Sequence, residues 1–431
     1  MPDPTGAMRP SERNHTLAPA LAPAVALLAI SSFINYIDRG NLAIAAPLLK
    51  DELHLSPWQL GILLSSFFWT YAFFQVVSGW LVDRFNANWI IAMGFSVWSV
   101  ATAATGLVHG FVLLLVVRLI LGIGESTAYP SYSKIFAKHF PETHRGRANA
   151  LVAAGLSCGP AFGTFLGGLL MAKYGWRPFF VVLGVVSLLW LPPWLRWMPR
   201  GPGLPSLAPK LSPPILEILA QRSAWGTFGG LFATNYLNYF LITWLPTYLL
   251  NERHFSMQGM AKLGGGALFA AALSTTISGW LADRWTASGG TPTRVRKTFT
   301  GLGLACASVI VVVSVVSDQR LASLFLFVAC ISFGLCTSNL WAITQTLAGP
   351  HAAGKWTGVQ NFVGNLAGIA APAVTGFVVQ RTGHFFWAFA ITAGVLLAGA
   401  FSWVFVIGPI EQVRWQSRPA SALAETDAPA T

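Results

Sequence analysis

The sequence predicts an all-α membrane protein whose twelve transmembrane helices form two pseudo-symmetric six-helix bundles. Only 10% of the 431 residues are charged and 54% are hydrophobic, whereas soluble domains carry about a quarter charged residues. The apolar residues fall in blocks of about 20, the length that crosses a bilayer core of about 30 Å. A seven-residue motif also occurs once in each half of the chain.

Twelve apolar blocks can be placed along the chain. The expected spans are 19–46, 58–82, 88–108, 111–135, 148–172, 178–197, 224–250, 260–282, 298–317, 321–347, 356–380 and 384–408. The first block is far longer than the core of a signal peptide, so we expect it to be retained as a span.

A proline-rich polar segment separates the first six spans from the last six. The predicted organisation is a cytoplasmic tail (1–18), a six-helix bundle (19–197), a cytoplasmic linker (198–222), a second six-helix bundle (223–408) and a cytoplasmic tail (409–431).

Lysine and arginine residues gather on one side of the predicted membrane. With both termini in the cytoplasm, 18 of the 27 Lys and Arg residues fall in cytoplasmic segments and 7 fall in outer loops. This is the bias that orients membrane proteins. It explains the net charge of +12 without a nucleic-acid partner, and it predicts an even number of spans.

An internal repeat indicates that the two halves arose by duplication. The motif Gly79–Phe85 (GWLVDRF) returns 200 positions later as Gly279–Trp285 (GWLADRW). Both copies end a predicted span on the cytoplasmic side, after spans 2 and 8. Such repeats are typical of transporters whose halves rock about a central site.

These motifs resemble the major facilitator superfamily over residues 19–408. Within it, the chain resembles the anion:cation symporter family, which includes bacterial sugar-acid transporters and is related to vesicular glutamate and sialic-acid carriers. The resemblance implies the major facilitator fold. The residues that carry it are Asn35–Arg39 (NYIDR), Tyr71, Arg118–Glu125 (RLILGIGE), Pro130, Trp341 and Asn361–Asn365 (NFVGN).

Four formally charged side chains lie well inside predicted spans: Asp38, Arg39, Arg118 and Glu125. Each costs roughly 2.5–3.5 kcal/mol to place at the centre of a bilayer, so such residues indicate function by default. Arg118 and Glu125 are seven positions apart, which puts them on one helix face about 10 Å apart along the axis.

The chemistry of these four residues suits an anion and protons. A planar guanidinium matches a carboxylate, so Arg39 and Arg118 are candidate substrate-binding residues. Burial favours the protonated form of a carboxyl group, so Asp38 and Glu125 are candidate proton-coupling residues. The resemblance implies the same roles. The alternative is that the four charges form static ion pairs between spans 1 and 4.

Four polar residues are further candidates for substrate contact: Tyr71, Ser338, Trp341 and Asn361. A membrane tryptophan is otherwise a packing or interface residue, and asparagine also joins helices by hydrogen bonds. Leu156 and Leu340 stand where sugar-acid members carry polar side chains. This departure favours a less hydroxylated carboxylate.

The repeated motif supplies candidate residues for a conformational latch: Asp83, Arg84, Asp283 and Arg284. In the family, such residues hold the halves together in the outward-open state. The alternative is that they are ordinary cytoplasmic charges with acidic partners.

No enzyme site, cofactor or metal is expected. Gly349–Lys355 matches most of a phosphate-binding loop, but Trp356 follows it where Ser or Thr is required, and no strand precedes it. The eight histidines show no metal-ligand spacing, and the four cysteines lie in apolar segments as small hydrophobic residues.

The sequence therefore predicts a monomeric, multi-pass protein of the cell inner membrane that imports an organic carboxylate with protons by alternating access. Its partners would be the organic anion, protons and the lipid bilayer, with no nucleic acid. Three alternatives stay open: an anion uniporter or exchanger without proton coupling, an exporter of amphipathic drugs, and a non-transporting membrane sensor or enzyme.

Overall fold

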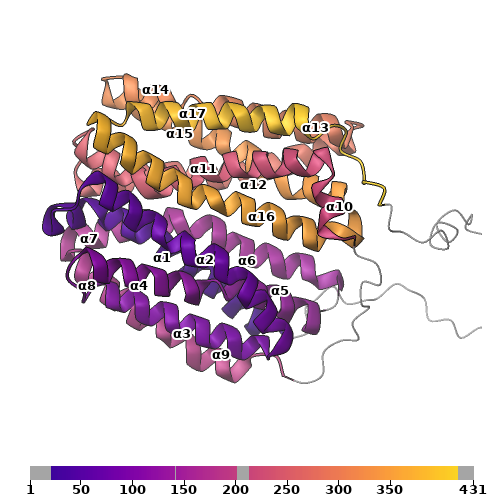
Figure 1. Cartoon of the computed structure of the whole chain (residues 1–431), viewed down its shortest axis with the longest axis horizontal. Helices are drawn as coiled ribbons and strands as arrows, with labels where there is room; N and C mark the ends of the chain where they lie inside the picture. Colours follow the sequence, from indigo (N-terminus) through magenta and orange to yellow (C-terminus); the bar gives the residue numbers. More distant parts are fainter. Residues whose placement is uncertain (1–20, 141, 201–212, 416–431) are drawn as a thin grey trace, which may run out of the picture.

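A computed structural model describes residues 21–140, 142–200 and 213–415. Every regular element in these ranges is helical. The long helices run side by side in two groups, one built from the first half of the chain and one from the second (Figure 1). The tail 1–18, residues 201–212 of the linker 198–222 and residues 416–431 of the tail 409–431 lie outside the described residues, so the predicted domain boundaries stay predictions.

The first group contains six spans, three of which are built from consecutive helical pieces. Its elements are α1 (Ala22–Leu53), α2 (Pro57–Arg84), α3 (Ala87–Thr105), α4 (Phe111–Glu125) with α5 (Ala128–His139), α6 (Glu142–Phe162) with a π-helical turn (Gly163–Gly167) and α7 (Gly168–Tyr174), and α8 (Trp176–Ser187) with a 3-10 turn (Leu188–Trp190) and α9 (Leu191–Trp197).

The second group contains the remaining helices of the chain. Its elements are α10 (Ile215–Leu219), α11 (Arg222–Asn251), α12 (Met257–Ala287), α13 (Pro292–Ala307) with α14 (Ile310–Val315), α15 (Gln319–Thr337), α16 (Leu340–Thr382), and α17 (Phe386–Phe401) with a π-helical turn (Ser402–Val406). Within α16, Gly349 has φ +64°, a conformation that favours glycine. This kink separates the predicted spans 321–347 and 356–380.

Ten described segments are long and apolar enough to cross a membrane. The two remaining long helices are α1 and α11, with 32 and 30 residues. They are the first helix of each half, they pack against each other, and they carry buried polar side chains such as Asp38, Arg39 and Thr234. With α1 and α11 counted as spans, the described helices are consistent with the predicted twelve.

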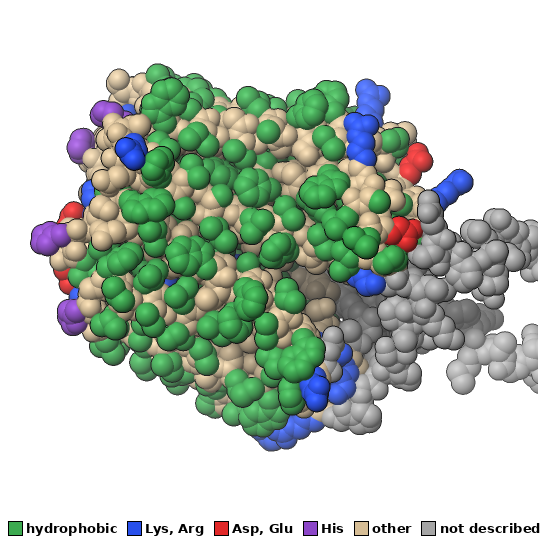
Figure 2. All heavy atoms as spheres, in the orientation of Figure 1, with side chains coloured by type: hydrophobic (Ala, Val, Ile, Leu, Met, Phe, Trp, Pro, Cys, Tyr) green, Lys and Arg blue, Asp and Glu red, His purple; other side chains and the backbone are tan. Residues whose placement is uncertain are grey.

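The outer surface is suited to lipid. Apolar side chains cover the flank of the molecule, and charged side chains gather toward its two ends (Figure 2). Large apolar residues such as Phe73, Leu189 and Phe405 are 65%, 69% and 61% exposed. A water-soluble monomer rarely exposes apolar surface so continuously, so the chain is a multi-pass membrane protein.

The duplication extends from the sequence to backbone geometry. His54 and His254, 200 positions apart, are the two non-glycine residues with positive φ among the described residues, at 50° and 56°. Two positions later, Ser56 caps α2 and Ser256 caps α12 through their side chains. The turn between the first two helices is therefore built in the same way in each half.

The two halves meet tightly at one end, which we call the closed end. There α2 and α16 approach so closely that a Cβ on Gly61 would lie 2.8 Å from the Pro372 carbonyl oxygen. A Cβ on Gly376 would lie 2.7 Å from the Pro57 carbonyl oxygen. Real Cβ atoms do not approach so closely, so glycine is required for this contact.

The opposite end, which we call the open end, carries both copies of the repeated motif. The side chains of Arg84 and Arg284 are exposed there, and Trp341 is 37% exposed. Figure 2 shows the surface hollowed between the halves toward this end. The halves are thus joined at the closed end and parted at the open end.

Candidate functional site

A buried ion pair lies at the centre of the first half. Arg39 on α1 donates its Nε–H to Oε2 of Glu125, at the end of α4, over 2.9 Å. Both side chains are buried, at 6% and 0% exposure. Removing one partner of such a pair leaves an uncompensated charge and typically costs about 3–5 kcal/mol.

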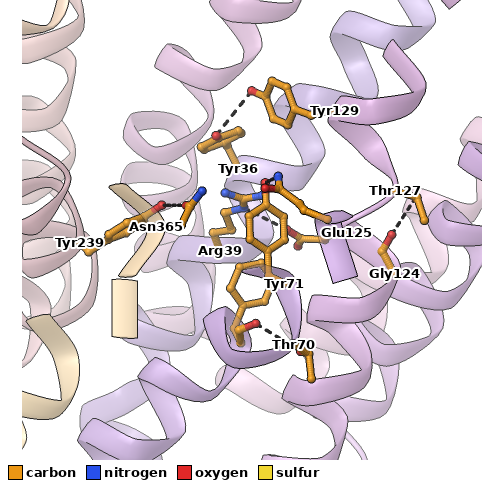
Figure 3. A network of polar contacts seen from close by, with 12 residues as sticks. Tyr36, Arg39, Thr70, Tyr71, Gly124, Glu125, Thr127, Tyr129, Tyr239 and Asn365 are labelled. Atoms are coloured by element: carbon orange, nitrogen blue, oxygen red, sulfur yellow. Dashed lines mark hydrogen bonds and ion pairs between the residues drawn. The ribbon is translucent and has the colours of Figure 1, made fainter. Parts of the chain in front are cut away.

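Aromatic rings surround the guanidinium of Arg39 (Figure 3). Its Cζ lies 4.3 Å from the ring centroid of Tyr71, 4.5 Å from that of Tyr36 and 5.2 Å from that of Phe67. Such faces stabilise a cation where water is scarce. Gln75 holds Tyr71 in place by donating to its hydroxyl over 2.8 Å.

The Arg39 side chain is not saturated by these contacts. Its Nη2 is buried and has no hydrogen-bond partner among the described residues. A buried N–H group without a partner costs roughly 1–3 kcal/mol, and more when charged. An acceptor brought into this site would recover that energy.

The second predicted arginine lies beside the first. Arg118 on α4 is 3% exposed, its Cζ lies 5.5 Å from the Phe67 ring centroid, and its Nε has no partner among the described residues. Both arginines line one small cavity between the halves. Its walls are Tyr36, Arg39, Leu64, Phe67, Phe68 and Arg118 from the first half and Asn238, Tyr239, Ile242 and Thr243 from α11.

Asp38 lies apart from this cavity. It is 1% exposed, and neither carboxyl oxygen has a hydrogen-bond partner among the described residues. The charged groups that act on it are Glu125 and Arg118. The structure therefore buries both predicted acids in the first half, with Glu125 paired to the cavity-lining Arg39 and Asp38 outside the cavity lining.

The predicted contacts in the second half do not line this cavity. Ser338 hydrogen-bonds Ser278 over 3.0 Å, Trp341 is part of the open end, and the backbone carbonyl of Asn361 accepts from the Asn365 amide over 2.9 Å. Their roles in substrate binding stay predictions. Leu156 and Leu340, which replace the polar side chains of sugar-acid members, lie in different surroundings. Leu156 is 36% exposed, whereas Leu340 is 3% exposed and part of the hydrophobic core.

Sequence reasoning missed the wall formed by α11. Tyr239 donates its hydroxyl to Oδ1 of Asn365 over 2.9 Å and so ties α11 to α16 (Figure 3). The 200-residue repeat contains a signal for this wall, since Asn238 and Tyr239 follow Asp38 and Arg39 by that interval.

The predicted latch residues lie at the open end without a partner in the other half, as far as their side chains are described. Arg84 covers Trp80 and Arg284 covers Trp280, with Cζ 5.6 and 5.4 Å from the ring centroids. Asp283 is exposed. The side chain of Asp83 lies outside the described part of the structure.

Comparison with known proteins places the chain in a family. The Major Facilitator Superfamily model matches residues 28–372. The hexuronate transporter of Bacillus subtilis (strain 168) is 28% identical over 400 residues, covering 90% of this chain and 95% of that protein. The D-galactonate transporter of Escherichia coli O6:H1 is 27% identical, covering 95% and 99%. The chloroplastic ascorbate transporter of Arabidopsis thaliana is 30% identical, covering 88% and 73%.

A solved structure has the same fold. A bacterial homologue of the human lysosomal transporter Spinster, in an inward-facing and occupied conformation, superposes with a TM-score of 0.77. The alignment covers 91% of this chain and 97% of that chain at 19% sequence identity. At this identity the likeness concerns the fold alone.

Proposed function

We propose, from the premise that this chain belongs to the Major Facilitator Superfamily, that it is a symporter importing an organic carboxylate together with protons. The chain is a membrane transporter and not an enzyme. The observation that carries the proposal is the buried Arg39, which keeps an unpartnered Nη2 and lines a small cavity together with Arg118.

Two arginines suit an anionic group such as a carboxylate. A guanidinium presents a planar fork of donors that fits a carboxylate, and both arginines have unpartnered N–H groups here. The relatives named above transport hexuronate, galactonate and ascorbate, which supports an organic acid as the substrate class.

Charge balance supplies a reason for proton coupling. With Asp38 and Glu125 ionised, the four buried charges sum to zero, and Glu125 occupies Arg39. An incoming anion would then give these four buried groups and the substrate a net negative charge, and it would compete with Glu125 for Arg39. Protonation of Glu125 frees Arg39 and leaves a positive site for the anion. Coupling follows if the fully loaded and empty carriers rearrange easily and the half-loaded forms do not.

The open and closed ends fit one state of an alternating-access cycle. The motif arginines and most of the basic residues lie toward the open end, which by the positive-inside bias would face the cytoplasm. The bundles 19–197 and 223–408 would rock about the cavity, and Asp83, Arg84, Asp283 and Arg284 would latch the open end when it closes. Both termini would be cytoplasmic, and the monomer in the inner membrane would be the working unit.

The carboxylate site is tested by Arg118→Ala in detergent-purified protein. A thermal-shift screen with glucuronate, galactonate, ascorbate, benzoate and 4-hydroxybenzoate first identifies a stabilising ligand. We expect Arg118→Ala to weaken its binding at least about tenfold, because a desolvated charged hydrogen bond is worth about 1.5–3 kcal/mol. Arg320→Ala, at an exposed position, is the matched control. Full affinity in a folded Arg118→Ala protein would remove this residue from the site.

A uniporter or exchanger on the same fold is the second candidate function. It is favoured if the Arg39–Glu125 pair is a static support that never opens. The two functions differ in whether protons accompany the substrate, which a pH measurement during uptake separates.

A further inference from the structure

The repeat allows each charged residue of the first half to be matched with its counterpart in the second half. The 200-residue interval matches Asp38 with Asn238 and Arg39 with Tyr239. A second alignment comes from hydrogen bonds between equivalent helices. Ser78 on α2 bonds Ser126 after α4 over 2.9 Å, and Ser278 on α12 bonds Ser338 after α15 over 3.0 Å.

This second match fixes the interval between α4 and α15 at 212 residues. Glu125 then corresponds to Thr337 and Arg118 corresponds to Cys330. Every ionisable residue of the central site thus has a neutral counterpart in the other half. The cavity has one charged wall, from α1 and α4, and one neutral wall, from α11.

Asn238 is the available hydrogen-bonding side chain of the neutral wall. Of its neighbours, Tyr239 is committed to Asn365, and Thr243 donates to the Tyr239 carbonyl oxygen over 2.6 Å. Asn238 is half-buried and lines the cavity, and no hydrogen bond holds its amide among the described residues. An asparagine amide offers two donors and two acceptor lone pairs.

The rest of the cavity is apolar and aromatic. Leu64, Phe67, Phe68 and Ile242 contribute hydrocarbon surface, and Tyr36 turns its ring toward Arg39. A sugar acid carries a hydroxyl on almost every carbon, and these walls would leave most of those hydroxyls without partners. Each unpaired polar group costs roughly 1–3 kcal/mol.

We propose that Asn238 is a substrate-contacting, specificity-determining residue that hydrogen-bonds a single polar group at the end of the substrate away from its carboxylate. The preferred substrate class is then a carboxylate with an apolar or aromatic body and one distal hydroxyl or carbonyl group. This inference rests on the proposed function, because it takes Arg39 and Arg118 as the carboxylate site.

The test compares three probes: 4-hydroxybenzoate, benzoate and galactonate. Binding to purified full-length protein is measured by titration calorimetry. We expect 4-hydroxybenzoate to bind about tenfold tighter than benzoate, the value of one net hydrogen bond of about 1.4 kcal/mol. We expect galactonate to bind more weakly than either. A preference for galactonate, or no binding of either benzoate, would overturn the proposal.

Asn238→Leu keeps the number and branching of the side-chain heavy atoms and removes the hydrogen bond. The substitution should lower the affinity for 4-hydroxybenzoate about tenfold and leave the affinity for benzoate within about twofold. The ratio of the two affinities, 4-hydroxybenzoate over benzoate, should then fall from about ten to about one. Asn251→Leu, at the exposed end of the same helix, should leave the ratio at about ten. An unchanged ratio in Asn238→Leu would overturn the role of Asn238.

Asn238→Asp keeps the proposal testable if the leucine variant does not fold. A carboxylate in the cavity should weaken both aromatic probes at least about tenfold by repulsion, whereas Asn251→Asp should leave both unchanged. Equal affinities in Asn238→Asp and the unmodified protein would also overturn the proposal. If Arg118→Ala retains benzoate affinity, the proposed function itself fails. If Arg118→Ala loses benzoate affinity but the Asn238 variants bind both aromatic probes like the unmodified protein, the proposed function stands and only the role of Asn238 is overturned.

Discussion

At the scale of single residues, Arg39 is the residue that we propose connects binding of the carboxylate to protonation. Its Nε is held by Glu125, its plane lies among three aromatic rings, and its Nη2 remains unpartnered. Glu125 keeps the second carboxyl oxygen, Oε1, without a partner as well. A residue pair that is strong but incompletely bonded can exchange one partner for another, which a saturated structural ion pair cannot do without large cost.

The first prediction concerns Glu125→Gln. The neutral amide no longer titrates, so binding of the carboxylate should lose the pH dependence that opening of the Arg39–Glu125 pair imposes, and uptake driven by a pH gradient in proteoliposomes should fall to background. Counterflow exchange of labelled for unlabelled substrate should persist, because it needs no net proton movement. The unmodified protein should bind the carboxylate at least about tenfold tighter at acid than at alkaline pH. At alkaline pH the ionised Glu125 holds Arg39, and this ion pair must open before the substrate binds.

Glu252→Gln is the matched control for this substitution. Glu252 lies near the closed end and accepts the backbone N–H of Phe385 over 3.0 Å, which a glutamine oxygen also does. Gradient-driven uptake by Glu125→Gln at the rate of the control would exclude Glu125 from coupling.

The charged residues of the candidate site were predictable from the sequence. Arg39, Arg118 and Glu125 stand out because charge is costly in lipid, and the structure brings them together with Tyr71. Phe67 and Asn238 were not predictable individually, because phenylalanine and asparagine occur in transmembrane helices for packing and helix pairing as well. Only three-dimensional proximity distinguishes the copies that line the cavity.

At the scale of helices, the contact between α2 and α16 closes one side of the molecule. Gly61 and Gly376 let two backbones from different halves touch, with Pro57 and Pro372 beside them. Small residues permit such close approach of membrane helices. The contact joins the halves in this state and must part for the closed end to open.

The second prediction is that Gly376→Leu prevents the closed end from forming. The side chain would overlap the backbone of Pro57 and Gly61, so the halves are forced apart there. Net transport in proteoliposomes should fall below about a tenth of the unmodified rate, the loss expected when a step is destabilised by about 1.4 kcal/mol or more. Ligand binding in detergent should persist.

Gly394→Leu on α17 tests whether any leucine in a span has this effect. A Cβ at Gly394 meets nothing within 4 Å, so transport should be unchanged. Normal transport by Gly376→Leu would show that the close contact is dispensable.

The helices themselves were mostly predictable, and their irregularities were not. Length and apolar character located the spans, and Gly349 separates α16 into the two spans expected there. The π-helical turns at Gly163–Gly167 and Ser402–Val406 leave no periodic signal, because they depend on the packing of neighbouring helices. The C-terminal end of α1 and both ends of α2 also extend beyond the predicted spans 19–46 and 58–82, since helices continue into the interface.

At the scale of the whole molecule, charge is divided unequally between two halves that are otherwise built alike. The first half holds Asp38, Arg39, Arg118 and Glu125, and the second half presents neutral side chains at the matching positions. A site between the halves can therefore hold the charged end of a solute on one bundle and its neutral end on the other. In the proposed cycle, rocking of the bundles would then open the site toward one end of the protein and close it toward the other.

The central claim is that these buried charges move a carboxylate together with protons. The most direct measurement is the external pH of weakly buffered proteoliposomes when the best-binding carboxylate is added at zero membrane potential. We predict that the outside becomes alkaline as substrate enters and that Glu125→Gln abolishes this change. Substrate uptake by the unmodified protein at constant external pH would contradict the account.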